Sequence, residues 1–340
     1  MNIKNEKKSI SIPRATGLLI IAVENSNPNG DPDQENDPRR RSHDQRGMIT
    51  GVSFKRKLRD LVLRKDETVW PIIASKIGIE QNEGNWGRDG YSFDILEQRE
   101  TVRGDVEKYL KNDLDAFKKR YWDARVFGNT FLEEKLKRDE LEIKKHGPDT
   151  IRTGVAQFGL AVSVAPVRVH RLTKTKMAPA EKGHKEGEEG PSRGMAPLAH
   201  RVVEHGVYCM PFFINPTGTQ GKRGTGCTAL DICLLLMLIR YAYPHTKSDI
   251  RPLVEVMHAW YAEHIDDIGS FSEFEFIEHL RPAKLIDSEK PSVSGVPLER
   301  QYRIPTEIDL GDNFLSRIKY GKLFDLCAEL PNWCVELEKA

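Results

Sequence analysis

The sequence lacks paired cysteines and long apolar runs, and both absences restrict the class of protein. Its 340 residues include five cysteines, an odd number with no CxxC spacing. That usage predicts reduced core thiols in a cytoplasmic protein rather than a disulfide framework or a zinc site. The longest apolar run, at 232–239, is too short to cross a bilayer, and residues 1–10 lack the apolar centre of a signal peptide. We therefore expect no membrane partner.

Motifs of known enzyme classes are also scarce. The ten histidines show no metal-binding spacing such as HExxH. The glycine-rich stretch GTQGKRGTG at 218–226 is not a P-loop, because Pro216 stands at the first glycine position and Arg223 replaces the Ser/Thr. It could still bring backbone amides, Lys222 and Arg223 near a phosphate, although a flexible loop before a helix explains it equally well. We expect no catalytic constellation, no cofactor and no metal.

A strong net charge is absent from the whole chain, yet positive charge is concentrated in one stretch. The net charge is +1, whereas ten basic and two acidic residues between Arg39 and Lys65 give that window +8. This asymmetry predicts a local surface for a polyanion on an otherwise balanced protein.

The basic window belongs to a predicted strand–loop–helix unit. Residues 16–24 are continuously apolar, which is typical of a central strand covered on both faces. Residues 25–50 are rich in Asn, Pro and Gly, and a loop of that length is usually functional. Thr50 can cap the helix that follows. The buried stripe of that helix is predicted to comprise Phe54, Leu58, Leu61 and Val62.

The remaining elements predict an α+β fold. Residues 66–150 are expected to form an inserted, mainly helical region. Strands are expected at 155–170 and 206–214, and the polar segment between them predicts a long hairpin extension. Helices are expected at 228–242, 251–265 and 314–330. The order of strands and helices is typical of a ferredoxin-like core with large insertions.

The motif SFKRKLR places Lys55 and Arg59 on one face of the predicted helix, with Arg56 beside them. Spaced cations on a rigid helix can follow successive phosphates, and the release of counterions makes such binding dependent on salt. Taken alone, the motif fits a solvated basic face equally well.

The loop at 25–33, NSNPNGDPD, has three possible interpretations. A calcium site is rejected because its twelfth position is Asn36 rather than Glu and a strand precedes it. The carboxylates of Asp31, Asp33 and Asp37 could hold a catalytic metal, although acidic residues in a Pro/Gly loop are more often turn formers. The Asn side chains could instead contact ribose hydroxyls and base edges of RNA.

Together these motifs resemble the backbone subunit of type I CRISPR RNA-guided surveillance complexes (Cascade), the CRISPR-associated "seven" family. The resemblance spans 16–285 and is closest to the branch of subtypes I-B and I-C. It rests on ENSNPNGDPD, SFKRKLR, DARVFG at 123–128, GVAQFG at 154–159, the strand around 206–215 and the glycine-rich loop with its helix.

The resemblance implies a modified RNA-recognition-motif (RRM, ferredoxin-like) palm formed by 1–65 and 151–340. Residues 66–150 would form a helical finger domain, and a β-hairpin at about 171–205 would form a thumb. Several copies would polymerise along one CRISPR RNA in a helical filament, together with other Cascade subunits. The guide would stay open to pair with target DNA in antiviral defence. The family is not enzymatic, so no catalytic residue is implied.

The resemblance also implies roles for individual residues. Combined with the glycine-rich loop, the predicted RNA-binding set is Asn27, Asn29, Lys55, Arg56, Arg59, Arg125, Phe127, Gln157, Lys222 and Arg223. The candidates for an apolar wedge that displaces one guide nucleotide are Met177, Met195, Leu198 and Val203.

Two alternatives remain at this point. A related type III family uses an Asp in the first loop, so a metal-dependent cleavage of target RNA at Asp31 or Asp33 is the second hypothesis. The third is a stand-alone RNA-binding protein that does not assemble along RNA.

Overall fold

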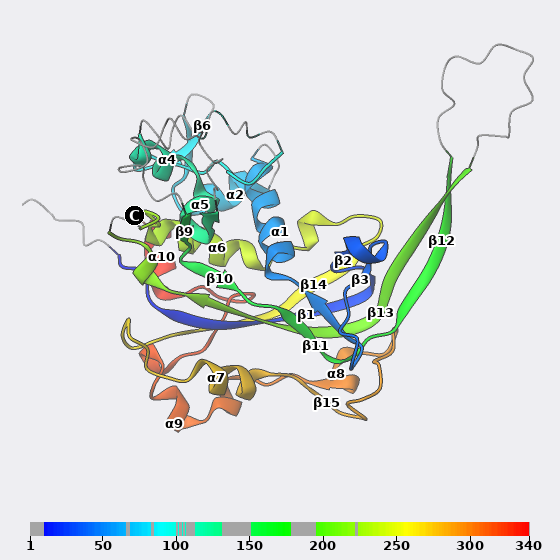
Figure 1. Ribbon diagram of the computed structural model, residues 1–340. Coiled ribbons are helices and arrows are strands. Elements are labelled where there is room, and N and C mark those ends of the chain that lie inside the picture. Colours follow the sequence, from blue (N-terminus) through cyan, green and yellow to red (C-terminus); the bar gives the residue numbers. More distant parts are fainter. Residues whose placement is uncertain are drawn as a thin grey trace, which may run out of the picture.

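The protein is built in three layers. The computed structural model describes residues 10–65, 69–82, 85–99, 101, 104, 106, 113–130, 151–177, 195–221 and 224–339. Helices lie above a curved antiparallel sheet, and a layer of short helices and strands lies below it (Figure 1). A long hairpin extends from one end of the sheet, away from the three layers.

Strand β1 (Ala15–Ser26) is the centre of the main sheet. It pairs antiparallel with β13 (Met195–Ile214) on one side and with β14 (Leu253–Glu263) on the other. Along β1 the side chains alternate between the two cores: Leu19 belongs to the upper one and Leu18 to the lower one. The predicted central strand with both faces covered is therefore confirmed.

The rest of the main sheet extends from these three strands. Its order is β17-β14-β1-β13-β11-β4, and β10 and β12 also pair with β13. The additional strands are β4 (Arg46–Ile49), β10 (Ala156–Phe158), β11 (Ala161–Pro166), β12 (Val169–Met177) and β17 (Phe324–Asp325). A large antiparallel sheet with separate helical layers confirms the α+β class.

The upper layer contains α1 (Gly51–Leu63), α6 (Ala229–Ile239) and α10 (Asn332–Lys339). Every residue of α6 is buried, so this helix is the centre of the upper core. Thr50 caps α1 as predicted: its hydroxyl accepts a hydrogen bond from the backbone N of Ser53 at 3.2 Å. Helix α6 starts with a capping box made by Thr228 and Asp231.

The inserted region packs on the same upper core. Its described elements are α2 (Val69–Lys76), β5 (Glu80–Asn82), β6 (Asn85–Arg88), β7 (Tyr91–Ser92), α4 (Leu114–Arg120), α5 (Trp122–Phe127) and β8 (Gly128–Thr130), which pairs with β9 (Ile151–Thr153). Trp70, Phe93 and Trp122 are buried in one cluster with the side chains of α1 and α6. Strands therefore accompany the predicted helices here, and the boundary of a finger domain stays a prediction.

The lower layer covers the other face of the sheet. It contains α7 (Glu273–Leu280), β15 (Ala283–Lys284), α8 (Leu298–Gln301), β16 (Tyr302–Arg303), the 3-10 turn η6 (Glu307–Leu310) and α9 (Asp312–Leu315). Phe276 and Phe314 bury their rings against Leu18 of β1 and its neighbours. Among the helices of the described residues, none has both the length and the apolar character that a membrane span requires.

Two predicted helices are wrong. Instead of the helix expected at 251–265, the chain forms strand β14, and the register shift opposite Ile20 and Ile21 leaves Met257 as an extra residue in the strand. This bulge interrupts the alternation of apolar residues and gives the segment an apparently helical spacing. The helix expected at 314–330 is replaced by the short α9, a turn at Tyr320, whose φ is 63°, and strand β17.

The buried ring of His264 joins β1 to the lower layer. Its Nδ1 accepts a hydrogen bond from the backbone N of Ser270 at 3.0 Å, and its Nε2 lies 3.2 Å from the hydroxyl of Thr16. The ring also stacks on Phe271 with 3.8 Å between centroids. Burial, together with the positive charge of Arg14, lowers the pKa of His264 to about 4.

We expect His264 to destabilise the fold in mild acid. The unfolded chain binds the proton below the ordinary histidine pKa of 6.5, whereas the folded protein binds it only near pH 4. The free energy of unfolding should therefore fall by about 2 kcal/mol between pH 7 and pH 5. Urea unfolding at the two pH values measures this loss. His264→Gln should reduce it and exposed His43→Gln should not; equal losses in all three proteins would contradict the assignment.

Candidate nucleic-acid interface

Helix α1 carries three of the six predicted RNA-binding cations, and Asn29 holds its first turn. The Oδ1 of Asn29 accepts hydrogen bonds from the backbone N of Thr50 at 2.9 Å and from its hydroxyl at 3.1 Å. Asn29 therefore connects the first loop to the start of α1. Its amide oxygen is engaged with Thr50, so it positions the helix.

Asn27 is buried within the first loop. Its Nδ2 donates to the carbonyl of Asn36, and its backbone N donates to the carbonyl of Ile250, each at 2.8 Å. Its Oδ1 is buried and has no hydrogen-bond partner among the described residues. Asn27 thus fixes the loop and retains one vacant acceptor.

Three residues of the predicted set meet between α1 and α5. The ammonium of Lys55 donates to the Oε1 of Gln157 at 3.3 Å and lies 5.2 Å from the ring centroid of Phe127. Burial and the nearby charge of Arg59 lower the pKa of Lys55. The structure therefore gathers Lys55, Phe127 and Gln157 in one place, and their contact with RNA stays a prediction.

Arg59 is neutralised by the inserted region. Its guanidinium pairs with Asp123 at 2.9 Å and with Glu97 at 3.0 Å. The carboxylate of Asp123 also accepts backbone hydrogen bonds from Leu96 at 2.7 Å and Glu97 at 3.1 Å. Because Arg59 is buried among these partners, it fastens α1 to the insertion rather than facing solvent.

Arg56 remains accessible. Its side chain is 45% exposed, pairs with Asp60 at 2.7 Å and donates to the carbonyl of Glu97 at 3.3 Å. An exposed pair of this kind contributes at most about 1 kcal/mol and can be exchanged for another anion.

Arg125 lies in the core, contrary to its predicted place at an RNA surface. It is fully buried and forms two hydrogen bonds with the carboxylate of Asp231, at 2.8 and 3.0 Å. Its remaining donors bind the carbonyls of Lys118, Lys119 and Ser92. Asp231 also caps α6, so this pair joins the insertion to the central helix. A phosphate cannot reach Arg125 in this arrangement.

The predicted wedge residues occupy different parts of the hairpin. Val203 is fully buried in the upper core, where β13 pairs with β1, so its side chain cannot enter a guide. Met177 pairs with Met195, and Leu198 with Lys174, along the arms of the hairpin. Residues 178–194 lie outside the described residues, as do Lys222 and Arg223.

The base of the hairpin is tied to the first loop by two arginines that the sequence analysis missed. Arg171 pairs with Asp37 at 3.1 Å, and Arg201 pairs with Asp37 at 3.0 Å and with Glu35. Arg171 and Arg201 are direct cross-strand partners. Two like charges at directly paired positions destabilise a hairpin unless an acidic group lies between them. The pairing of two arginines could therefore have indicated a nearby carboxylate.

The carboxylates of the first loop are largely engaged within the protein. Asp31 accepts a hydrogen bond from the backbone N of Asp33 at 3.3 Å and pairs with Arg39 at 3.2 Å. Within the described ranges, His, Cys, Asp and Glu side chains form no group of three that could hold a metal.

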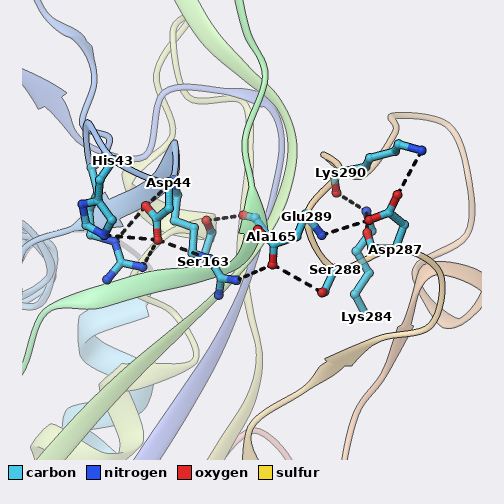
Figure 2. Close-up of polar contacts among 11 residues, drawn as sticks. His43, Asp44, Ser163, Ala165, Lys284, Asp287, Ser288, Glu289 and Lys290 are labelled. Atoms are coloured by element: carbon cyan, nitrogen blue, oxygen red, sulfur yellow. Dashed lines mark hydrogen bonds and ion pairs between the residues drawn. The ribbon is translucent and has the colours of Figure 1, made fainter.

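A further acidic contact comes from the lower layer. Figure 2 shows the segment with Lys284, Asp287 and Glu289 beside the loop that carries Asp44. Arg46 lies between them, 3.5 Å from Asp44 and 3.6 Å from Glu289.

Cations of the basic window that pair with carboxylates are Arg39, Arg41, Arg46, Arg56, Arg59 and Lys65. Arg39, Arg46, Arg59 and Lys65 pair with carboxylates outside the window, so tertiary pairing offsets part of the +8 counted along the sequence.

The comparison with family models identifies one family. Residues 13–298 match the family model described as CRISPR-associated protein Cas7. One similar solved structure is titled "CRISPR RNA-guided surveillance complex"; identity is 14%, the match covers 74% of this chain and 70% of that chain, and the TM-score is 0.38. Another is titled "CRISPR RNA-guided surveillance complex, pre-nicking", with 13% identity, coverages of 89% and 88%, and a TM-score of 0.43. A comparison with curated proteins gives no match.

We expect Arg125→Met to destabilise the protein severely, because it leaves the carboxylate of Asp231 buried without a counter-charge. The loss in the free energy of unfolding should be about 3–5 kcal/mol. Arg56→Met, which breaks an exposed pair, should cost less than about 1 kcal/mol. Urea unfolding of both variants measures the difference. If Arg125→Met were as stable as Arg56→Met and had lost RNA binding, Arg125 would be a contact residue after all.

Proposed function

The chain belongs to the CRISPR-associated protein Cas7 family, and from that premise we propose that it is a guide-RNA-binding backbone subunit of a CRISPR surveillance complex. Several copies bind one CRISPR RNA side by side, with other subunits of a type I complex, and present the guide for pairing with target DNA. We also propose that the chain belongs to the branch of the family found in subtypes I-B and I-C, and that it acts in the cytoplasm. The observation that carries it is the family match over 13–298.

The topology of the core supports the RRM-like part of the proposal. The chain order β1, α1, β11, β13, α6, β14 alternates as in a ferredoxin-like fold. Its central strands lie in the order β14-β1-β13-β11, and each neighbouring pair is antiparallel. The two helices of this unit, α1 and α6, pack together above the sheet (Figure 1).

The hairpin supports assembly along a strand of RNA. Its arms, β12 and β13, are paired from Val169 with Val203 to Met177 with Met195 and reach well beyond the three layers (Figure 1). Arg171 and Arg201 fix the angle at which it leaves, because they tie its base to Asp37. A projecting arm that is rigid at its base is suited to contact a neighbouring copy.

The chemistry favours recognition of the RNA backbone. A subunit that carries any guide sequence must contact phosphate and ribose and leave the base edges free for pairing. Near α1, the accessible guanidinium of Arg56 can contact a phosphate without requiring a particular base.

We also propose that the subunit has no catalytic activity. The carboxylate of Asp31 is occupied by Arg39 and by the backbone of Asp33, and Asp37 is held by Arg171 and Arg201. A metal would have to displace these cations before it could activate water.

The number of protein copies on one RNA should depend on the length of that RNA. Because each copy occupies a fixed length of guide, the mass of the reconstituted complex should grow in equal steps as the RNA is lengthened. Mass photometry and native mass spectrometry with RNAs of increasing length measure the steps, and an RNA too short for two copies is the control. One protein per RNA at every length would contradict assembly and favour a stand-alone RNA-binding protein.

The proposed lack of catalytic activity can be tested with target RNA. Complementary target RNA should remain intact when it is incubated with the guide-loaded complex and Mg²⁺ or Mn²⁺. Wild type and Asp33→Ala should give the same electrophoretic pattern, because Asp33 has no catalytic role in the proposal. Products that form with wild type and vanish with Asp33→Ala would establish the type III-like alternative.

A further inference from the structure

The most exposed large apolar side chains of the described residues lie in the lower layer or in the turn that leads into it. Ile308 is 89% exposed, Ile268 87% and Phe274 81%, and every other large apolar side chain in the described ranges is less exposed. Single exposed apolar side chains are ordinary on a protein surface. Here the three most exposed ones share the side of the sheet opposite helix α1 (Figure 1).

The three side chains come from elements that are fastened to one another. The guanidinium of Arg14 donates to the carbonyl of Ile268 at 2.8 Å and pairs with Glu273, the first residue of α7, at 3.4 Å. Helix α7 also packs against η6, and both elements contribute to the lower core. The turn before α7, α7 itself and η6 therefore adjoin. We call the surface that carries Ile268, Phe274 and Ile308 the lower face.

Helix α7 turns Phe274 away from the core. Its buried side chains are Phe276 and Leu280, four positions apart on the inner side of the helix. Phe274 is two positions before Phe276 and therefore points about 200° away from it. Glu278, one turn after Phe274, lies on the same outer side and is also exposed. The helix thus presents an aromatic ring next to a carboxylate, and neither contributes to the core.

The lower face is also strongly acidic. Residues 265–280 contain five Asp or Glu and residues 306–312 contain three, with no Lys or Arg in either stretch. Three of these eight carboxylates pair with arginines, in the pairs Glu273–Arg14, Glu275–Arg317 and Asp309–Arg303. The other five, which include Glu278 and Asp312, form no ion pair with a described residue. On a chain with a net charge of +1, this is a local negative surface.

These charges decide what kind of ligand the lower face fits. Carboxylates repel the phosphates of RNA and of an anionic membrane, so both are unsuitable ligands. Two copies of the chain cannot meet symmetrically through this face, because its carboxylates would oppose one another. A protein surface that offers lysine or arginine beside apolar side chains compensates the charge and covers the exposed side chains at once.

We propose that the lower face docks a different protein, through a segment of that protein that carries lysine or arginine together with apolar side chains. Phe274, Ile268 and Ile308 are the apolar anchors, and the unpaired carboxylates, Glu278 among them, select the positive charge. The inference goes beyond the proposed function and does not depend on it. Because the lower face lies on the other side of the sheet, its occupant leaves the surface around α1 accessible (Figure 1).

A pair of synthetic peptides tests the charge and the apolar contact together. The first peptide is two repeats of LKKLLKL, which form a helix with leucine on one side, and the second has glutamate at every lysine position. Fluorescence anisotropy should show that wild type binds the first peptide and not the second, with an affinity that falls as salt is raised. No binding of the leucine/lysine peptide, or equal binding of both peptides, would refute the proposal.

Single substitutions locate the peptide on the protein. Phe274→Ser should weaken binding of the leucine/lysine peptide at least about tenfold, because it removes an exposed ring that the peptide covers. Glu278→Lys should also weaken binding and should reduce its dependence on salt. Ile72→Ser, which removes an exposed apolar side chain of α2, is the matched control and should bind as wild type. Unchanged binding by Phe274→Ser, or an equal loss with Ile72→Ser, would overturn the site.

The stability of the free protein separates docking from a structural role. Phe274→Ser and Ile72→Ser should unfold at the same urea concentration as wild type, because both replaced side chains are exposed. If Phe274→Ser unfolded at a clearly lower concentration and bound the peptide weakly, Phe274 would support the fold and the proposal would be wrong.

Photo-cross-linking identifies the occupant in the full chain. The benzophenone amino acid p-benzoylphenylalanine takes the place of Phe274, the chain is expressed together with its neighbouring genes, and the cross-linked peptides are sequenced by mass spectrometry. We expect links to a different protein, in a segment with more lysine and arginine than aspartate and glutamate, and fewer links when Glu278→Lys is added. Links to a second copy of this chain, or to no protein, would contradict the proposal.

The outcome is separate from that of the proposed function. A chain that assembles on RNA but binds neither the peptide nor a basic partner would leave the guide-binding function intact and refute the docking surface. A chain that shows the expected cross-links and fails to bind RNA would establish the docking surface and refute the guide-binding function.

Discussion

The burial of β1 on both faces is the constraint on which the rest of the structure depends. A strand with apolar side chains on each side needs backbone partners at both edges and a covering layer above and below. Strands β13 and β14 supply the edges, α1 and α6 lie in the core above, and the segment from α7 to α9 covers the face below. The three-layered form follows from these requirements.

Charge compensation is the second organising feature. Several cations of the basic window meet a carboxylate from another part of the chain: Arg59 meets Asp123 and Glu97, and Arg46 meets Glu289. These pairs attach the inserted region and the lower layer to the strand–loop–helix unit. Removing a buried partner leaves an uncompensated charge, so the same cations that suggest RNA binding also hold the fold together.

The hairpin and the first loop behave as one unit at their junction. Asp37 lies between Arg171 and Arg201, while Asn29 fixes the start of α1. A single loop therefore sets both the direction of the hairpin and the position of the basic helix. This coupling keeps the projecting hairpin and α1 in a fixed relation to each other.

The sequence by itself determined the local elements and the family. Strand β1, the Thr50 cap, helix α6 and the hairpin follow from apolar periodicity, capping residues and composition, and the ordered motifs identified the family that the match over 13–298 confirms. Those signals are local, so one sequence suffices to detect them.

Only the tertiary structure decided the rest. The strand at Leu253–Glu263 was hidden by its bulge, because its pairing with β1 overrides the spacing of its side chains. The environment of these cations also depended on carboxylates far away in the chain: Arg125 became a core residue through Asp231, and Arg59 was neutralised by Asp123. Charge can be counted along a sequence, but its compensation depends on distances that only folding sets.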